Sequence, residues 1–132
     1  MNKEKSVAKL LQEAQTVFNE FIRKRDEGKG CISCGAPYFS DCGHVFKIST
    51  RPAMRFNPMA AHGQCRECNS KHDGNYDAYC LGIAARYGIN YLTEVIQCAN
   101  ESRKSCHKWS RMELQEIIFN CKQQIKIINS SK

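Results

Sequence analysis

Cys31-Ile-Ser-Cys34 and Cys65-Arg-Glu-Cys68 are two Cys-X-X-Cys motifs, and they decide how this chain folds. Two thiolates three residues apart on a tight turn hold adjacent corners of a tetrahedron, and a second such turn supplies the other two corners. The spacing therefore predicts a closed structural zinc site with these four cysteines as ligands. A redox-active pair is the alternative interpretation, but that chemistry ordinarily needs one such motif rather than two.

The segment around these motifs contains little that would hold it together without a metal. From Cys31 to about Asn75 no helical period is visible, and all three prolines of the chain fall inside this window. Only Tyr38–Phe39 and Val45–Ile48 are typical of short strands. Structural zinc contributes its binding free energy, roughly 10 to 16 kcal/mol in zinc-finger peptides, directly to folding. We therefore expect a zinc-stabilised core of loops and short strands here.

Amphipathic helices are predicted on both sides of this core. Apolar residues three and four apart predict a helix over residues 5–25. Beyond the core, we expect a helix that ends at Gly88 and a short one across Tyr91–Cys98. Ser110 and Glu113 form a capping-box pattern at the start of a last helix. We also expect Cys80 and Cys121, on apolar helix faces, to be small core residues.

Length and charge narrow the class of protein. The 132 residues predict a single domain, with an N-terminal helix (1–29), a zinc-stapled core (30–75) and a helical C-terminal part (76–132). Twenty Lys and Arg against thirteen Asp and Glu give a net charge of +7, which favours a polyanionic partner such as nucleic acid. No apolar run approaches the length of a bilayer span, so we expect no membrane association. Nine cysteines, an odd number, argue against a complete disulfide framework.

Polar residues between and just after the two motifs have the composition of a hydrolytic site. Asp41, His44, His62 and Asn69 offer oxygen and imidazole groups suited to a hard divalent cation and to a general base. No acidic residue occurs from residue 42 to residue 66. Basic side chains are present instead, and we expect four of them to contact DNA phosphates: Lys47, Arg51, Arg55 and Lys71.

Several short elements occur in an order that matches a known family. The matching elements are Phe21–Asp26, Cys31–Gly35, Gly43-His44, Arg55–Asn57, His62 with Gln64-Cys65, Cys68-Asn69 and Gly74-Asn75. In this order the chain resembles the NinG (Rap) family of phage recombination nucleases. More broadly, it is similar to the zinc-stapled HNH endonucleases. The resemblance implies an α+β fold with a small ββα-metal core flanked by N- and C-terminal helices.

The resemblance also implies roles for individual residues. His44 would be the general base, and Asn69 would contact a catalytic Mg²⁺ or Mn²⁺ ion. HNH enzymes typically place an acidic metal ligand directly before the base, where this chain has Gly43, so Asp41 is a candidate substitute. An asparagine common in the family is also replaced, by Ala60, which leaves Asn57 or His62 to take its catalytic or metal-binding role.

The function implied is a metal-dependent, structure-specific DNA endonuclease that cleaves branched recombination intermediates such as Holliday junctions and D-loops. Because a four-way junction has twofold symmetry, such an enzyme is expected to act as a homodimer. Its place would be the cytoplasm of a bacterial host cell. A non-catalytic, zinc-stapled DNA-binding module is the alternative, with His44 and Asn69 as structural residues.

Overall fold

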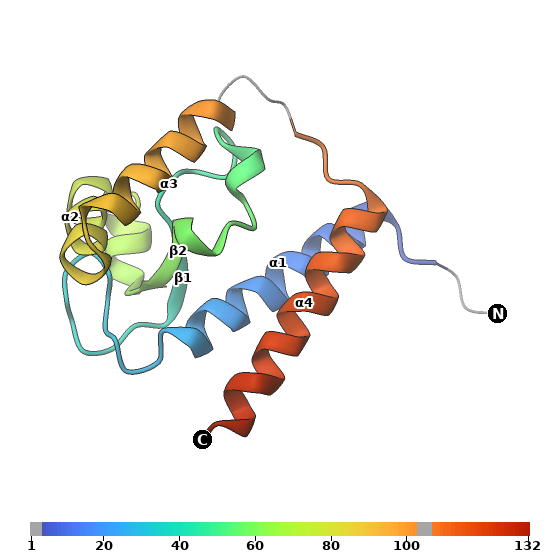
Figure 1. The fold of residues 1–132 in the computed structure, drawn as a ribbon, viewed down its shortest axis with the longest axis horizontal. Helices are drawn as coiled ribbons and strands as arrows, with labels where there is room; N and C mark the ends of the chain where they lie inside the picture. Colours follow the sequence, from blue (N-terminus) through green and yellow to red (C-terminus); the bar gives the residue numbers. More distant parts are fainter. Residues whose placement is uncertain (1–3, 103–106) are drawn as a thin grey trace.

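The computed structural model describes residues 4–102 and 107–132 (Figure 1). Its helices and strands are α1 (Val7–Arg25), β1 (Asp41–His44), β2 (Ala61–Gln64), α2 (Tyr76–Tyr87), α3 (Ile89–Ser102) and α4 (Arg111–Ser130). Three short helical turns complete the list: η1 (Pro52–Met54), η2 (Pro58–Ala60) and the π-helical turn η3 (Glu67–Lys71). The protein is thus a mixed, largely helical fold with a small two-stranded sheet. None of the helices in the described residues has the length and apolar character needed to span a bilayer.

The helices begin and end close to where the sequence predicts. α1 spans all but the first two residues of the expected range, and the Ser6 side chain accepts a hydrogen bond from the backbone N–H of Lys9 at its start. The capping box of α4 is confirmed, because Ser110 and Glu113 each bond the other's backbone N–H. α2 ends at Tyr87, with Gly88 as its C-cap, which agrees with the expected end at Gly88. α3 is longer than predicted at both ends.

The two strands do not lie where the sequence places them. The predicted strands Tyr38–Phe39 and Val45–Ile48 are wrong, and the sheet pairs Asp41–His44 with Ala61–Gln64 in antiparallel register. Strand propensity favoured aromatic and β-branched residues. A strand also needs a partner. Ala61, the first residue of β2, pairs with His44, and the residues before Ala61 form the η2 turn. The chain beyond Val45 therefore has no strand to pair with.

The sheet lies between two helical pairs, each with its own apolar core (Figure 1). α4 packs along α1 in the same direction, since Arg111 bonds the Lys5 carbonyl at one end and Lys132 pairs with Glu27 at the other. Cys121 is buried in this core. α2 and α3 pack on the other side, with Cys80 at the edge of their core.

A buried ion pair fixes the end of α1 to the sheet. The Asp26 side chain is completely buried and accepts two hydrogen bonds from Arg25, at 2.7 and 3.0 Å, and one from the backbone N–H of Gly63, at 2.9 Å. Arg25 in turn donates to the carbonyls of Pro58 and Ala61, both at 2.8 Å. The C-terminus of α1 therefore sets the position of β2 and, through the sheet, of β1.

Candidate functional site

The four cysteines of the two Cys-X-X-Cys motifs meet in one cluster. The Sγ atoms of Cys31, Cys34, Cys65 and Cys68 all lie within 4.8 Å of one another. The Cys34 and Cys65 sulfurs are 3.8 Å apart. Four sulfurs around a zinc ion with Zn–S bonds of about 2.3 Å would also be about 3.8 Å apart, so the cluster fits a tetrahedral zinc ion.

Hydrogen-bond donors point at these sulfurs and favour the thiolate at Cys31, whereas burial raises the pKa of Cys68 to about 12. Backbone N–H groups of Cys65 and Cys68 donate to the sulfurs of Cys31 and Cys65, at 3.3 and 3.4 Å. The Asn75 amide donates to the Cys68 sulfur at 3.4 Å. Burial raises the pKa of Cys31, but neighbouring backbone N–H donors outweigh it and bring the pKa down to about 7. Such donors orient and stabilise metal-bound sulfur.

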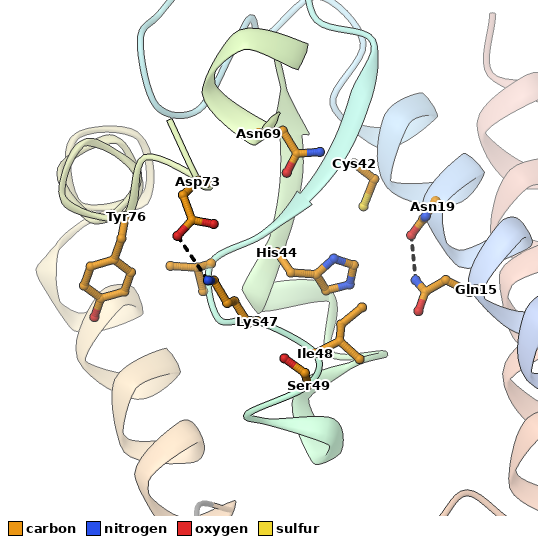
Figure 2. Close-up of a pocket in the computed structure, with 12 residues that line it drawn as sticks. Gln15, Asn19, Cys42, His44, Lys47, Ile48, Ser49, Asn69, Asp73 and Tyr76 are labelled. Carbon is orange, nitrogen blue, oxygen red and sulfur yellow. Dashed lines mark hydrogen bonds and ion pairs between the residues drawn. The ribbon is translucent and has the colours of Figure 1, made fainter. Parts of the chain in front are cut away.

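A cleft of about 380 Å³ opens beside the sheet, between α1, β1 and the start of α2 (Figure 2). Cys42 and His44 line it from one face of β1, since alternate residues of a strand share a face. α1 supplies Gln15 and Asn19 on the opposite wall. The remaining lining residues are Val45, Lys47, Ile48, Ser49, Asn69, Asp73, Gly74 and Tyr76.

His44 is held as a neutral imidazole with a defined tautomer. Its Nε2 lies 3.0 Å from the backbone carbonyl of Arg55, and its ring stacks on Phe18 with centroids 5.9 Å apart. A carbonyl only accepts, so Nε2 carries the proton and Nδ1 keeps a free lone pair. Burial lowers the pKa of His44, and the nearby Arg55 charge adds to this although the hydrogen bond opposes it. The ring is therefore neutral at physiological pH.

Asn69 and Asp41 form a pair at the edge of the cleft. The Asn69 amide N–H donates to Asp41 Oδ2 at 3.1 Å. The Asn69 amide oxygen takes no part in this hydrogen bond. Ser40 and Arg66 donate to the other Asp41 oxygen at 2.9 and 3.3 Å. Burial raises the pKa of Asp41, but these hydrogen bonds lower it overall, so the carboxyl is ionised.

His62 lies outside the cleft, on the opposite face of the sheet. It is fully buried, with Nδ1 3.1 Å from the Tyr79 hydroxyl and Nε2 3.3 Å from the Tyr91 hydroxyl. Burial lowers its pKa to about 3. Because both ring nitrogens are engaged, this position does not fit a catalytic or metal-binding role. Asn57 is likewise engaged locally, where it caps η2 by accepting from Met59 N–H.

The four basic residues predicted to contact DNA have different environments. Lys47 is exposed at the cleft and pairs with exposed Asp73 at 3.0 Å (Figure 2). Lys71 is exposed on η3. Arg51 is half-buried and donates to the Thr50 carbonyl at 3.0 Å. Arg55 is also half-buried, and its Nε donates to Gln15 at 2.7 Å.

Sequence reasoning missed the contribution of α1 to the cleft. Gln15 and Asn19 are one turn apart and joined by a 2.7 Å hydrogen bond, so they form a short polar patch inside an otherwise apolar helix face. Two polar residues within the apolar stripe of an amphipathic helix are the pattern from which this part of the cleft could have been predicted. Cys42 was also missed; burial raises the pKa of its thiol to about 12, so it lines the cleft as a neutral group.

Comparison with known proteins identifies relatives over nearly the whole chain. Residues 1–131 match the family described as "Bacteriophage Lambda NinG protein". Protein ninG of Escherichia phage lambda is 32% identical over 124 residues, covering 92% of this chain and 58% of that protein. Protein ninG of Salmonella phage P22 is also 32% identical over 124 residues, covering 92% of this chain and 59% of its own length. The chain thus spans less than two thirds of these relatives, and no solved structure matches it. On this similarity, the chain belongs to the NinG family of phage proteins.

Proposed function

We propose that this chain is a metal-dependent endonuclease of the HNH type that hydrolyses phosphodiester bonds in branched DNA. The observation that carries the proposal is the cleft, which is lined both by a neutral histidine with a free Nδ1 and by the amide of Asn69, which donates to the Asp41 carboxylate. The order of the core, with two antiparallel strands followed by helical segments, agrees with a ββα-metal arrangement.

His44 is the proposed general base. A water molecule that attacks phosphorus must lose a proton, and an imidazole nitrogen with a free lone pair can take it. Nδ1 is that nitrogen, since Nε2 donates to the Arg55 carbonyl. After the transfer, the same carbonyl bond stabilises the charged ring. Stacking on Phe18 keeps the ring in place during the transfer.

Asn69 and Asp41 are the proposed ligands of one Mg²⁺ or Mn²⁺ ion. An ionised carboxylate and an amide oxygen are the donor types that such cations prefer, with waters and a substrate phosphate completing the shell. When bound, the ion supplies positive charge that neutralises the charge developing on the phosphate. In the structure the Asn69 amide N–H donates to Asp41 at 3.1 Å, so the amide would have to turn its oxygen toward the ion for both side chains to bind it.

Lys47, Arg51 and Lys71 are the proposed phosphate contacts. Lys47 pairs with Asp73 through side chains that are 63% and 82% exposed. An exposed pair of this kind contributes little to stability and is weakened by salt, so a DNA phosphate can displace the carboxylate. Arg55 is left out of this set because its guanidinium is committed to Gln15 and to the Phe56 ring.

Cleavage of a labelled synthetic four-way junction tests the proposal. Zinc-loaded protein should cut the junction with Mg²⁺ or Mn²⁺ and not when that ion is withheld. His44→Ala should lower the cleavage rate by about 10² or more while junction binding is retained. Asn69→Ala should raise the metal concentration needed for half-maximal cleavage.

The alternative function, a DNA-binding module without catalysis, predicts a different result. The wild type would then shift the junction in a gel without cutting it under any metal condition. His72→Ala is a suitable control, because His72 is an exposed histidine on the same core and does not line the cleft. If His44→Ala cuts at the rate of His72→Ala, the HNH assignment is wrong.

A further inference from the structure

The segment that holds His44 in its tautomer is itself held by α1. Arg55 directs its main-chain carbonyl to His44 Nε2 and its side-chain Nε to Gln15 Oε1, at 3.0 and 2.7 Å. Both bonds come from one residue, so the contact with Gln15 restrains the segment that carries the carbonyl accepting from His44. Gln15 lies 40 positions away in sequence, on a rigid helix.

Gln15 is oriented for this contact. Its amide N–H donates to Asn19 Oδ1 at 2.7 Å (Figure 2). Its carbonyl oxygen is therefore the atom that accepts from Arg55. Asn19 lies one turn further along α1, where side chains four residues apart are neighbours. The three side chains therefore form a chain of hydrogen bonds of fixed polarity, in which Arg55 donates to Gln15 and Gln15 donates to Asn19.

The Arg55 side chain is poorly placed for DNA. It is half-buried, its guanidinium lies 5.7 Å from the centroid of the Phe56 ring, and burial lowers its pKa. The neighbouring aromatic contact, between Phe56 and Phe18, also ties this segment to α1, at a centroid distance of 5.7 Å. Arg55 is thus a link between the helix and the histidine.

We propose that Gln15 is a positioning residue, which acts through Arg55 to hold His44 in the tautomer that leaves Nδ1 free. This inference rests on the proposed function for its catalytic consequence, but the tautomer itself is a property of the folded protein. Helix α1 would then fix the tautomer of the general base, His44, in addition to forming one wall of the cleft.

Substitutions at two positions, Gln15 and Arg55, separate this role from DNA binding. Gln15→Leu removes the acceptor, whereas Gln15→Glu keeps an acceptor oxygen for Arg55. Arg55→Lys keeps the positive charge but loses the planar guanidinium that reaches Gln15. Gln12→Leu is the matched control, because Gln12 is an exposed glutamine one turn earlier on α1.

The measurement is the ¹⁵N NMR spectrum of histidine-labelled, zinc-loaded protein, with His44 assigned by its loss in His44→Gln. Wild type, Gln12→Leu and Gln15→Glu should show a protonated Nε2 alone, and Gln15→Leu and Arg55→Lys a mixture of tautomers. In junction cleavage, Gln15→Leu and Arg55→Lys should lower kcat about 3- to 10-fold at unchanged KM, the loss of one hydrogen bond.

The outcomes distinguish this inference from the function on which it rests. A Gln15→Leu protein whose His44 signals match the wild type overturns the positioning role. A rise in KM at constant kcat also overturns it, because that result makes Gln15 or Arg55 a substrate contact. If the wild type does not cut DNA while Gln15→Leu changes the tautomer as expected, the positioning role holds and the nuclease proposal fails.

Discussion

Replacing Asp26 with Asn tests whether the buried ion pair at the end of α1 holds the sheet in place. The substitution keeps the size of the side chain and one oxygen that can accept from Gly63 N–H. It removes the negative charge that faces Arg25 and turns one acceptor oxygen into an NH₂ group that can no longer accept from Arg25. Any loss of stability therefore reports on the ion pair rather than on packing.

The expected loss follows from burial. Removing one partner of a buried ion pair costs about 3 to 5 kcal/mol, because the other charge is left without compensation. The Asp26 side chain is 0% exposed, but the Arg25 side chain is 24% exposed. Arg25 also keeps the carbonyls of Pro58 and Ala61 as acceptors. We therefore expect the free energy of unfolding to fall by about 2 to 4 kcal/mol.

The pH dependence gives a second, independent readout. Burial raises the pKa of Asp26, but the hydrogen bonds and charge of Arg25, with the Gly63 N–H, lower it overall below its ordinary value. A group whose pKa is lower in the folded state stabilises the fold above its unfolded pKa, about 3.9 for Asp, and loses this effect as the pH falls through the folded pKa. The difference between wild type and Asp26→Asn should stay constant above about pH 5 and shrink in stronger acid.

Urea unfolding followed by the fluorescence of Trp109 measures both effects. Glu27→Gln is the control, because Glu27 is the next residue and its ion pair with Lys132 is exposed, so its loss should be much smaller. An Asp26→Asn protein as stable as Glu27→Gln at neutral pH would refute the reasoning, since the pair would then contribute nothing to the fold.

Three further results are expected from the structure. Protein purified without chelator should contain one zinc per chain, and stripping it should unfold the core around Cys31 and Cys65, seen as loss of amide dispersion in NMR spectra. Tyr79→Phe should lower the free energy of unfolding by about 1 to 3 kcal/mol in urea, because the buried Gly43 carbonyl loses its 2.7 Å donor. Lys47→Gln should weaken DNA binding and reduce the slope of log affinity against log salt by about 1, and an unchanged slope would remove Lys47 from the phosphate contacts.

The helices could be predicted from sequence because their signals are local. The apolar period of α1 and the capping box of α4 depend on residues within a few positions of each other. The paired cysteine motifs also have local spacing, and the structure brings them together as expected. The strands could not be placed in this way, since their register depends on contacts such as Asp26 with Gly63, which are distant in sequence.

The candidate site was predicted only in part for the same reason. His44 and Asn69 meet at one cleft as the resemblance implied, but composition alone gave His62 the same chemistry. Antiparallel pairing places His62 opposite Gly43, and therefore on the face away from His44. The register of the strands decides on which face of the sheet a side chain lies, and this register could not be predicted from the sequence pattern.

The glycine before His44 also has a structural reason. A Cβ atom at Gly43 would lie 1.9 Å from Gln64 Oε1 and 2.8 Å from its Cδ. Gln64 cannot swing aside cheaply, because it is fully buried and its amide N–H groups donate to Ser33 Oγ and the Gly74 carbonyl at 2.9 and 2.7 Å. No acidic side chain fits at position 43 while Gln64 keeps these bonds.

An acid two residues earlier escapes this conflict, but alternation along β1 places it, like Gly43 and His62, on the face away from His44. Asp41 occupies that position, and its carboxylate reaches Asn69 at the edge of the cleft. The proposed use of Asp41 in place of an acid at position 43 is therefore linked to the buried Gln64, whose hydrogen bonds leave no room for a side chain at Gly43. Restoring an acid by Gly43→Asp should destabilise the fold without replacing Asp41, because the new carboxylate would have to displace Gln64 from its buried hydrogen bonds.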